Sequence, residues 1–140
     1  MLTWYYLRKG RLNEAQKEID ERLAKAPNNP RFLIYQALLL ALKGDFQKSV
    51  AALPGIVGKV ELHHQSRHHF TYDAACIYAL AGNSTEAVRW LKETANTGFP
   101  NYPLFERDPF LNRIRQAPEF IEFMAEQKAQ WEKLRAKFGS

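Results

Sequence analysis

Apolar residues recur every three or four positions along most of the chain, and the clearest case is the stretch from Thr71 to Ala95. Its first half carries Ala74 and Ala75 at helical spacing, and these two small side chains allow a second helix backbone to come close. Gly82 can adopt the positive φ that ends a helix, and Ser84 can cap the helix that follows. The pattern therefore predicts two amphipathic helices that meet at Gly82.

The same turn pattern occurs twice upstream, so internal repetition is the most informative feature of the chain. Gly10 and Gly44 are 34 residues apart, and Gly44 and Gly82 are 38 residues apart. The segments that begin at these glycines read GRLNEA, GDFQKS and GNSTEA. Five positions after each glycine stands a small residue, namely Ala15, Ser49 and Ala87. A period near 34 residues predicts an all-α fold of stacked helical hairpins.

These repeated residues resemble the tetratricopeptide repeat family. The family pattern has small residues midway along the first helix, a glycine at the turn, an alanine five residues later and a closing proline. The matching residues are Gly10, Ala15 and Pro27 in the first repeat, Ala37, Gly44 and Phe46 in the second, and Ala75, Tyr78, Gly82 and Ala87 in the third. The resemblance implies a solenoid with repeats at about 1–29, 30–67 and 68–98 within one domain, 1–140.

The chain departs from the family pattern in the second and third repeats. Ser49 replaces the alanine, and Pro54 with Gly55 falls inside the second helix of the second repeat, where we expect a kink or a break. The third repeat closes with Gly98-Phe99-Pro100 and carries four additional residues. These fall near ELHHQSRHHF at 61–70, where we expect a longer helix or loop.

The first repeat is short at its N-terminal side. Fourteen residues separate Pro30 from Gly44, whereas nine precede Gly10. Either the chain belongs to a longer protein or its first helix lacks more than one turn. Both interpretations leave an apolar edge that an upstream helix would cover, made of Leu2, Trp4, Tyr5 and Leu7. A terminal repeat without a polar cap tends to stack on another surface, so we expect this edge to mediate self-association, for example in a homodimer.

The repeat pattern stops at Gly98, and residues 99–140 form a capping tail. Prolines that suit the first turn of a helix follow Asp108 and Ala117, which predicts two helix starts. The last helix, about 118–137, carries its large apolar residues on one side, namely Phe120, Phe123, Met124, Trp131, Leu134 and Phe138. The tail also resembles the closing segment of repeat domains attached to bacterial signalling proteins, including Ser/Thr kinases, adenylate cyclases and winged-helix regulators.

Composition and charge exclude several classes of protein. A hydrophobic share of 46% and a charged share of 25% are those of a soluble globular domain. No apolar run approaches the roughly 18 residues of a membrane span. The net charge of +5 is interleaved with carboxylates along the chain, which disfavours a nucleic-acid surface. The N-terminus lacks the order of a secretory signal, so we expect a cytoplasmic protein, or a periplasmic one if a parent protein is anchored in the membrane.

Reactive motifs are scarce. His64 and His68 have a spacing that suits zinc on a helix, but no nearby cysteine or glutamate cluster completes the ligand set, and we predict no metal site. Cys76 is the only cysteine and falls inside an apolar helix. The sequence has no glycine-rich phosphate loop, no zinc-protease motif and no nucleophile elbow. We therefore expect neither an enzyme nor a cofactor.

The resemblance implies that the first helix of each repeat lines a concave groove. The residues placed on that groove are Arg31, Ile34, Tyr35, Leu38 and Leu42 from the second repeat and His69, Tyr72, Asp73, Cys76 and Leu80 from the third. Family members that bind chaperones carry Lys, Asn and Arg there, whereas this chain has Ile34 and Leu38. An apolar groove favours an amphipathic helix or a hydrophobic peptide.

Three interpretations of function remain. The first is a protein-interaction scaffold, forming part of a larger bacterial signalling protein. The second is a structural module that assembles through its N-terminal edge, and the third is a nucleic-acid binder. A further alternative concerns the groove itself, because the tail helix could fold back and fill it, which would place Leu38 and Tyr72 in the core.

Overall fold

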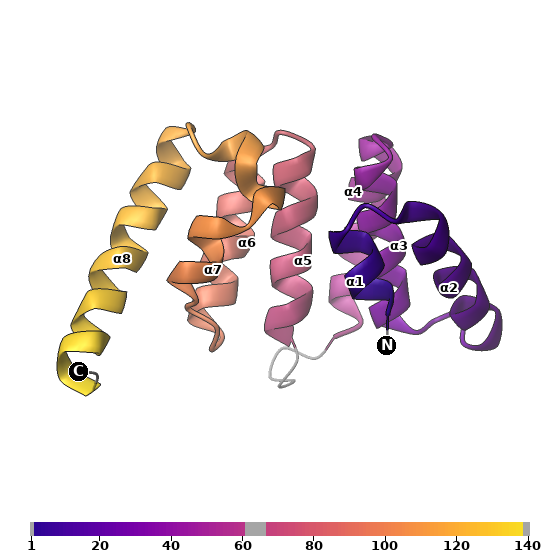
Figure 1. Cartoon of the computed structure of the whole chain (residues 1–140), viewed down its shortest axis with the longest axis horizontal. Coiled ribbons are helices and arrows are strands. Elements are labelled where there is room, and N and C mark those ends of the chain that lie inside the picture. Colours follow the sequence, from indigo (N-terminus) through magenta and orange to yellow (C-terminus); the bar gives the residue numbers. More distant parts are fainter. Residues whose placement is uncertain (1, 61–66, 139–140) are drawn as a thin grey trace.

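The computed structural model describes residues 2–60 and 67–138, and every regular element in this part of the chain is a helix (Figure 1). Its elements in chain order are α1 (Thr3–Arg8), α2 (Leu12–Lys25), α3 (Pro30–Leu42), α4 (Phe46–Gly58), α5 (Arg67–Leu80), α6 (Ser84–Asn96), α7 (Tyr102–Arg107), the 3-10 helix η1 (Pro109–Ile114) and α8 (Pro118–Phe138). The all-α fold class predicted from the sequence is confirmed. The expectation of a longer helix or loop near 61–70 falls mainly on residues 61–66, outside the described residues, as does His64.

The helices pack side by side, and Figure 1 shows α2 at one end of the molecule, α5 and α6 in the middle and α8 at the other end. The first six helices pair as α1 with α2, α3 with α4, and α5 with α6. The turns within these pairs contain Gly10, Gly44 and Gly82, whose φ angles are 74°, 89° and 81°. Only glycine adopts such angles readily, which explains its presence at each turn and confirms the predicted positions of the turns.

A small residue stands five positions after each of these glycines, and its side chain lies inside the molecule. Ala15, Ser49 and Ala87 are all completely buried. The Ser49 hydroxyl donates a hydrogen bond to the Ala37 carbonyl of the neighbouring helix at 2.6 Å. That bond satisfies the buried hydroxyl, so serine takes the place of alanine without leaving an unpaired polar group.

The helix α4 is continuous from Phe46 to Gly58 although Pro54 lies inside it, so the break expected there does not occur. Pro54 is exposed to solvent, while Leu53, Ile56 and Val57 are buried against neighbouring helices. Burial of these apolar side chains opposes the loss of one backbone hydrogen bond at the proline.

The tail forms three elements. η1 begins at Pro109 and α8 at Pro118, as predicted from the two prolines. The short helix α7 was not predicted, and its first turn is capped by the Asn101 side chain, which accepts a hydrogen bond from the Leu104 N–H at 3.2 Å. η1 packs against α5, and α8 packs against α6 and α7. The tail therefore covers one face of the helical pairs and also their C-terminal end.

Two glycine substitutions of opposite effect test the turns. Gly44→Ala forces a side chain into a positive φ and should lower the free energy of unfolding by about 1 kcal/mol. Gly55→Ala lies within α4, where an added Cβ meets nothing within 4 Å, and should raise it by up to about 1 kcal/mol. Urea denaturation monitored by circular dichroism measures both, and equal effects of the two changes would contradict the assignment of Gly44 to a turn.

Candidate functional site

The groove residues predicted from the sequence divide into two groups along α3 and α5. On α5, those toward the C-terminal end are covered by the segment from Asp108 to Ile114, in which Phe110, Leu111 and Ile114 are buried. Arg113 of this segment donates to the Leu80 carbonyl at 2.9 Å. An apolar stripe on a helical face gains free energy when it is removed from water, and η1 supplies the covering apolar side chains. On α3, the corresponding residues lie among α1, α2, α4 and α5.

The predicted open apolar groove is therefore corrected. Ile34, Leu38 and Cys76 are at most 1% exposed and belong to the core, while Leu42 and Leu80 are half-buried. The tail does fill this part of the concave face, as one alternative supposed, but the element that packs against α5 is η1, whereas α8 lies against α6 and α7.

Asp108 holds η1 in place. Its carboxylate accepts a hydrogen bond from Arg8 at 2.6 Å and another from the Tyr72 hydroxyl. The same carboxylate caps η1 by accepting from the Phe110 N–H at 2.9 Å, and Arg115 donates to the Asp108 carbonyl at 2.7 Å. The Asp108 side chain is fully buried. One charged group thus joins α1, α5 and η1.

The groups beside Asp108 are poor nucleophiles. Burial raises the pKa of the Tyr72 hydroxyl, and the neighbouring thiol and carboxylate raise it further. Burial and the Asp108 carboxylate likewise raise the pKa of the Cys76 thiol, whose sulfur lies 3.9 Å from Asp108 Oδ2. Because the thiolate is the reactive form of cysteine, Cys76 acts as a small apolar residue here.

Side chains from the N-terminal halves of α3 and α5 line the concave pocket, a cavity of about 340 Å³. It is lined by Trp4, Arg8, Arg31, Tyr35, His69, Tyr72, Asp73, Phe99 and Leu104. Five of the ten groove residues predicted from the sequence meet here, namely Arg31, Tyr35, His69, Tyr72 and Asp73. The open part of the concave face is thus aromatic and charged.

Asp73 is the most perturbed carboxylate of this pocket. It is 8% exposed, and within residues 2–60 and 67–138 no hydrogen bond or ion pair engages its side chain. Burial raises the pKa of Asp73 to about 7, against the opposing effect of Arg8 and Arg31. Burial also lowers the pKa of His69, with His68 and Arg31 contributing in the same direction.

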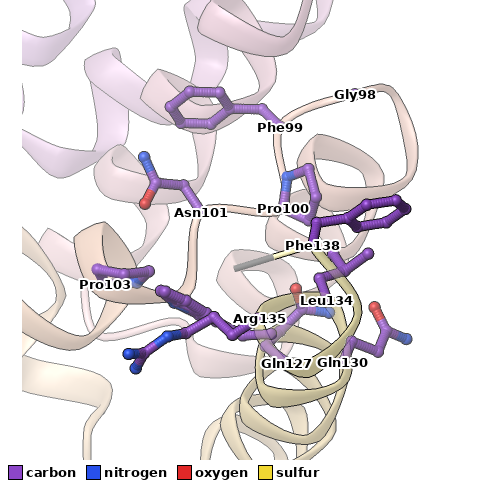
Figure 2. A pocket seen from close by; sticks show the side chains of 11 residues that line it. Gly98, Phe99, Pro100, Asn101, Pro103, Gln127, Gln130, Leu134, Arg135 and Phe138 are labelled. Carbon is purple, nitrogen blue, oxygen red and sulfur yellow. The ribbon is translucent and has the colours of Figure 1, made fainter. Parts of the chain in front are cut away.

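A second opening, the α7–α8 groove, has a volume of about 630 Å³ (Figure 2). One wall is the segment from Gly98 to Pro103, and the other is the C-terminal half of α8. The α8 wall consists of Gln127, Gln130, Trp131, Leu134, Arg135 and Phe138. Leu134 is 51% exposed and Phe138 76%. The predicted stripe of α8 is therefore buried near Phe120 and Phe123 but open toward its C-terminal end.

The predicted N-terminal edge is exposed in part. Leu2, Trp4 and Tyr5 are each about half exposed, whereas Leu7 is buried in the core, so the inclusion of Leu7 in this edge is corrected. α1 is anchored by Thr3, whose backbone N–H donates to Glu18 of α2 at 3.0 Å. The exposed apolar residues thus stand on a fixed helix.

Among the residues with described positions, no three His, Cys, Asp or Glu side chains form a group that suits a metal ion. His68 stacks on Phe99 instead, with ring centroids 5.2 Å apart. In the same parts of the chain, every helix is either too short or too polar to cross a membrane.

Removal of the Asp108 carboxylate tests its role in holding η1. Asp108→Ala leaves Arg8 buried without its counter-charge and should lower the free energy of unfolding by about 3–5 kcal/mol. Glu14→Ala removes the partner of Arg11 at the surface and should leave the urea midpoint nearly unchanged. Similar midpoints for the two variants would show that η1 does not depend on Asp108.

Asp73 should make stability depend on pH. Because its pKa is raised on folding, the native state holds a proton between about pH 4 and 7 that the unfolded state has lost. Stability should therefore fall as pH rises through this window and stay level above it. Asp73→Asn should remove the fall and stabilise the protein at pH 8 by on the order of 3 kcal/mol.

The measurement is urea denaturation of wild type and Asp73→Asn between pH 4 and 8. The difference between their free energies of unfolding reports the titration of Asp73 apart from that of the groups around it, namely Arg8, Arg31, His69, Tyr72 and Asp108. The exposed carboxylate of Glu21 provides the control, and Glu21→Gln should follow the wild type. Parallel pH profiles of Asp73→Asn and wild type would contradict the raised pKa.

Comparisons of the chain with protein-family models, with curated proteins and with solved structures gave no match. Function is therefore argued from the two openings and the exposed edge. Of the two openings, the α7–α8 groove has the larger volume, about 630 Å³ against about 340 Å³.

Proposed function

We propose that this chain is a protein-interaction module of the tetratricopeptide repeat type that binds an amphipathic helix of a partner protein. The observation that carries the proposal is the α7–α8 groove, where Leu134 and Phe138 stand open on a helix whose first half is buried. The site differs from the concave groove expected from the sequence, because the apolar residues of that groove lie in the core.

The repeat pattern supports an interaction module. The three glycine turns, and the buried small residue five positions after each, are features of tetratricopeptide hairpins. Proteins of this architecture expose extended surfaces without a reaction centre, and their function is recognition. The buried, protonated Cys76 is consistent with such a role.

The chemistry of the groove selects the partner. Its apolar residues Trp131, Leu134 and Phe138 are spaced three and four positions apart on one side of α8, which matches the apolar stripe of a second helix. Residues 128–138 carry four basic side chains and one acidic side chain. The preferred partner is therefore an amphipathic helix with acidic residues beside its apolar stripe.

The resemblance of the tail to that of repeat domains on bacterial signalling proteins favours a regulatory role. In this proposal the module belongs to a larger signalling protein of the cytoplasm and brings a partner to it. Its ligand is protein, with neither a cofactor nor nucleic acid involved.

A peptide-display library of helical sequences tests the groove. Wild type should enrich peptides with apolar residues at helical spacing and Asp or Glu beside them. Leu134→Glu should lower the affinity for those peptides by at least about tenfold, because it places a carboxylate in the centre of the apolar surface. Isothermal titration of the enriched peptides provides the affinities.

Ile121→Glu is the matched control, because Ile121 is also exposed on α8 but does not line the groove. It should bind the selected peptides as wild type does. Enrichment of no sequence class, or equal binding by the Leu134→Glu variant, would overturn the proposal.

The exposed N-terminal edge favours self-assembly as a second candidate function. Leu2, Trp4 and Tyr5 present an apolar patch on the anchored helix α1. If this patch joins two copies, Tyr5→Glu should convert a dimer to a monomer, whereas Leu134→Glu should not. Light scattering over a range of concentrations decides the point, and a wild-type protein that stays monomeric at high concentration rules this function out.

A further inference from the structure

The concave pocket shares Phe99 with the proposed helix-binding groove but is otherwise lined by different residues, and it contains a carboxylate. Asp73 is more than nine-tenths buried, and no hydrogen bond from residues 2–60 and 67–138 engages its side chain. Its oxygens keep access to the cavity rather than being sealed in the core. A largely buried carboxylate is costly unless it is paired, and a ligand in the cavity can supply the partner.

Two arginines line the same cavity as Asp73. Within the described residues, the Arg31 guanidinium donates one long hydrogen bond, of 3.4 Å, to the Tyr35 hydroxyl, which leaves its other N–H groups for a ligand. Arg8 binds Asp108 through Nη1, and its Nε is sealed from the cavity, so Arg8 contributes positive charge rather than a donor. No nitrogen of Arg8 or Arg31 lies within 4.0 Å of an Asp73 oxygen, so the opposite charges interact without forming an ion pair.

This arrangement discriminates among ligands by charge. A ligand with only a positive charge would pair with Asp73 but face two arginines, and one with only a negative charge would pair with Arg31 but face the carboxylate. A ligand that carries an ammonium and a carboxylate on adjacent atoms can satisfy both ends. Aromatic rings and Leu104 form the remaining walls, which suits an apolar substituent.

We propose that the concave pocket binds a free α-amino acid with an apolar side chain. Its ammonium group donates to Asp73, and its carboxylate accepts from the Arg31 guanidinium. The side chain packs against the rings of Tyr35, Tyr72 and Phe99. A volume of about 340 Å³ accommodates a molecule of this size with little room for a longer peptide.

The pH dependence of binding follows from the same arrangement. The ammonium of the ligand requires an ionised Asp73, whose pKa in the empty pocket is about 7, with Arg8, Arg31, His69, Tyr72 and Asp108 around it. Affinity should therefore rise between pH 6 and 8, and this rise should be absent in Asp73→Asn.

The first experiment is a titration of the full chain with L-leucine, L-methionine and L-phenylalanine, followed by calorimetry and by saturation-transfer NMR. Two derivatives then remove one charge each: phenylalaninamide lacks the carboxylate, and N-acetylphenylalanine lacks the ammonium. Each should bind at least about tenfold more weakly than the free amino acid, because each loses a charge-assisted hydrogen bond.

Two variants cross-check the assignment of each end. Asp73→Asn should lower the affinity for phenylalanine more than the affinity for N-acetylphenylalanine, which lacks the ammonium. Arg31→Gln should lower the affinity for phenylalanine more than the affinity for phenylalaninamide, which lacks the carboxylate. Arg89→Gln, an exposed change on α6, is the control and should bind as wild type does. Circular dichroism establishes that all three variants are folded.

The proposal is overturned if none of the three amino acids binds, or if either derivative binds as well as its parent. It is also overturned if Asp73→Asn and Arg31→Gln leave the affinity unchanged. Preferential binding of N-acetylphenylalanine alone would identify an anion site, and that of the amide alone a cation site. Neither result bears on the proposal that the α7–α8 groove binds a helix, which Leu134→Glu tests separately.

Discussion

The buried carboxylate of Asp108 is the interaction on which the arrangement of the chain depends. It receives hydrogen bonds from Arg8 near one end of the sequence and from Tyr72 in the middle, and it caps η1 through Phe110. Loss of any one of these partners would leave a buried charge or donor unpaired, so the contacts depend on one another. Helical repeats are usually held by contacts between neighbours. Here a contact spanning 100 residues joins the first helix to the tail.

This contact divides the concave face into two parts with different properties. Where η1 lies on α5, the side chain of Cys76 is removed from water, and Leu38 of the neighbouring α3 is buried in the same core. One or two turns earlier, the two helices carry Arg31, Tyr35 and Asp73, which line a cavity. α5 thus provides both the packing that holds η1 and part of the polar surface available to a ligand.

The sequence predicted what is set locally and missed what is set by tertiary contact. The three glycine turns, the small residues of the helix pairs and the two proline starts depend on near neighbours, and the structure has all of them. The helix α7 has six residues, too few for a periodic pattern to appear. The position of η1 depends on the contact between Asp108 and Arg8, and no local sequence pattern predicts a contact between residues so far apart. Burial of Leu53 and Val57 keeps α4 continuous through Pro54, against its local preference.

The candidate site was predictable from the sequence to a similar extent. Five of the ten groove residues predicted from the repeat pattern line the concave pocket. It could not show which of those residues the tail would cover, nor that the end of α8 would stay open. Charged residues distinguish the pocket, because the apolar residues of the predicted groove lie in the core.

Phe99 gives the two openings a common boundary, since its side chain contributes to the walls of both. The ring is stacked on His68 at an interplanar angle of 12°, which limits how far it can turn. A molecule that displaced this ring from one side would alter the shape offered on the other. By thermodynamic linkage any such influence acts equally in both directions, so occupancy of either cavity would be sensed by the other through one aromatic side chain.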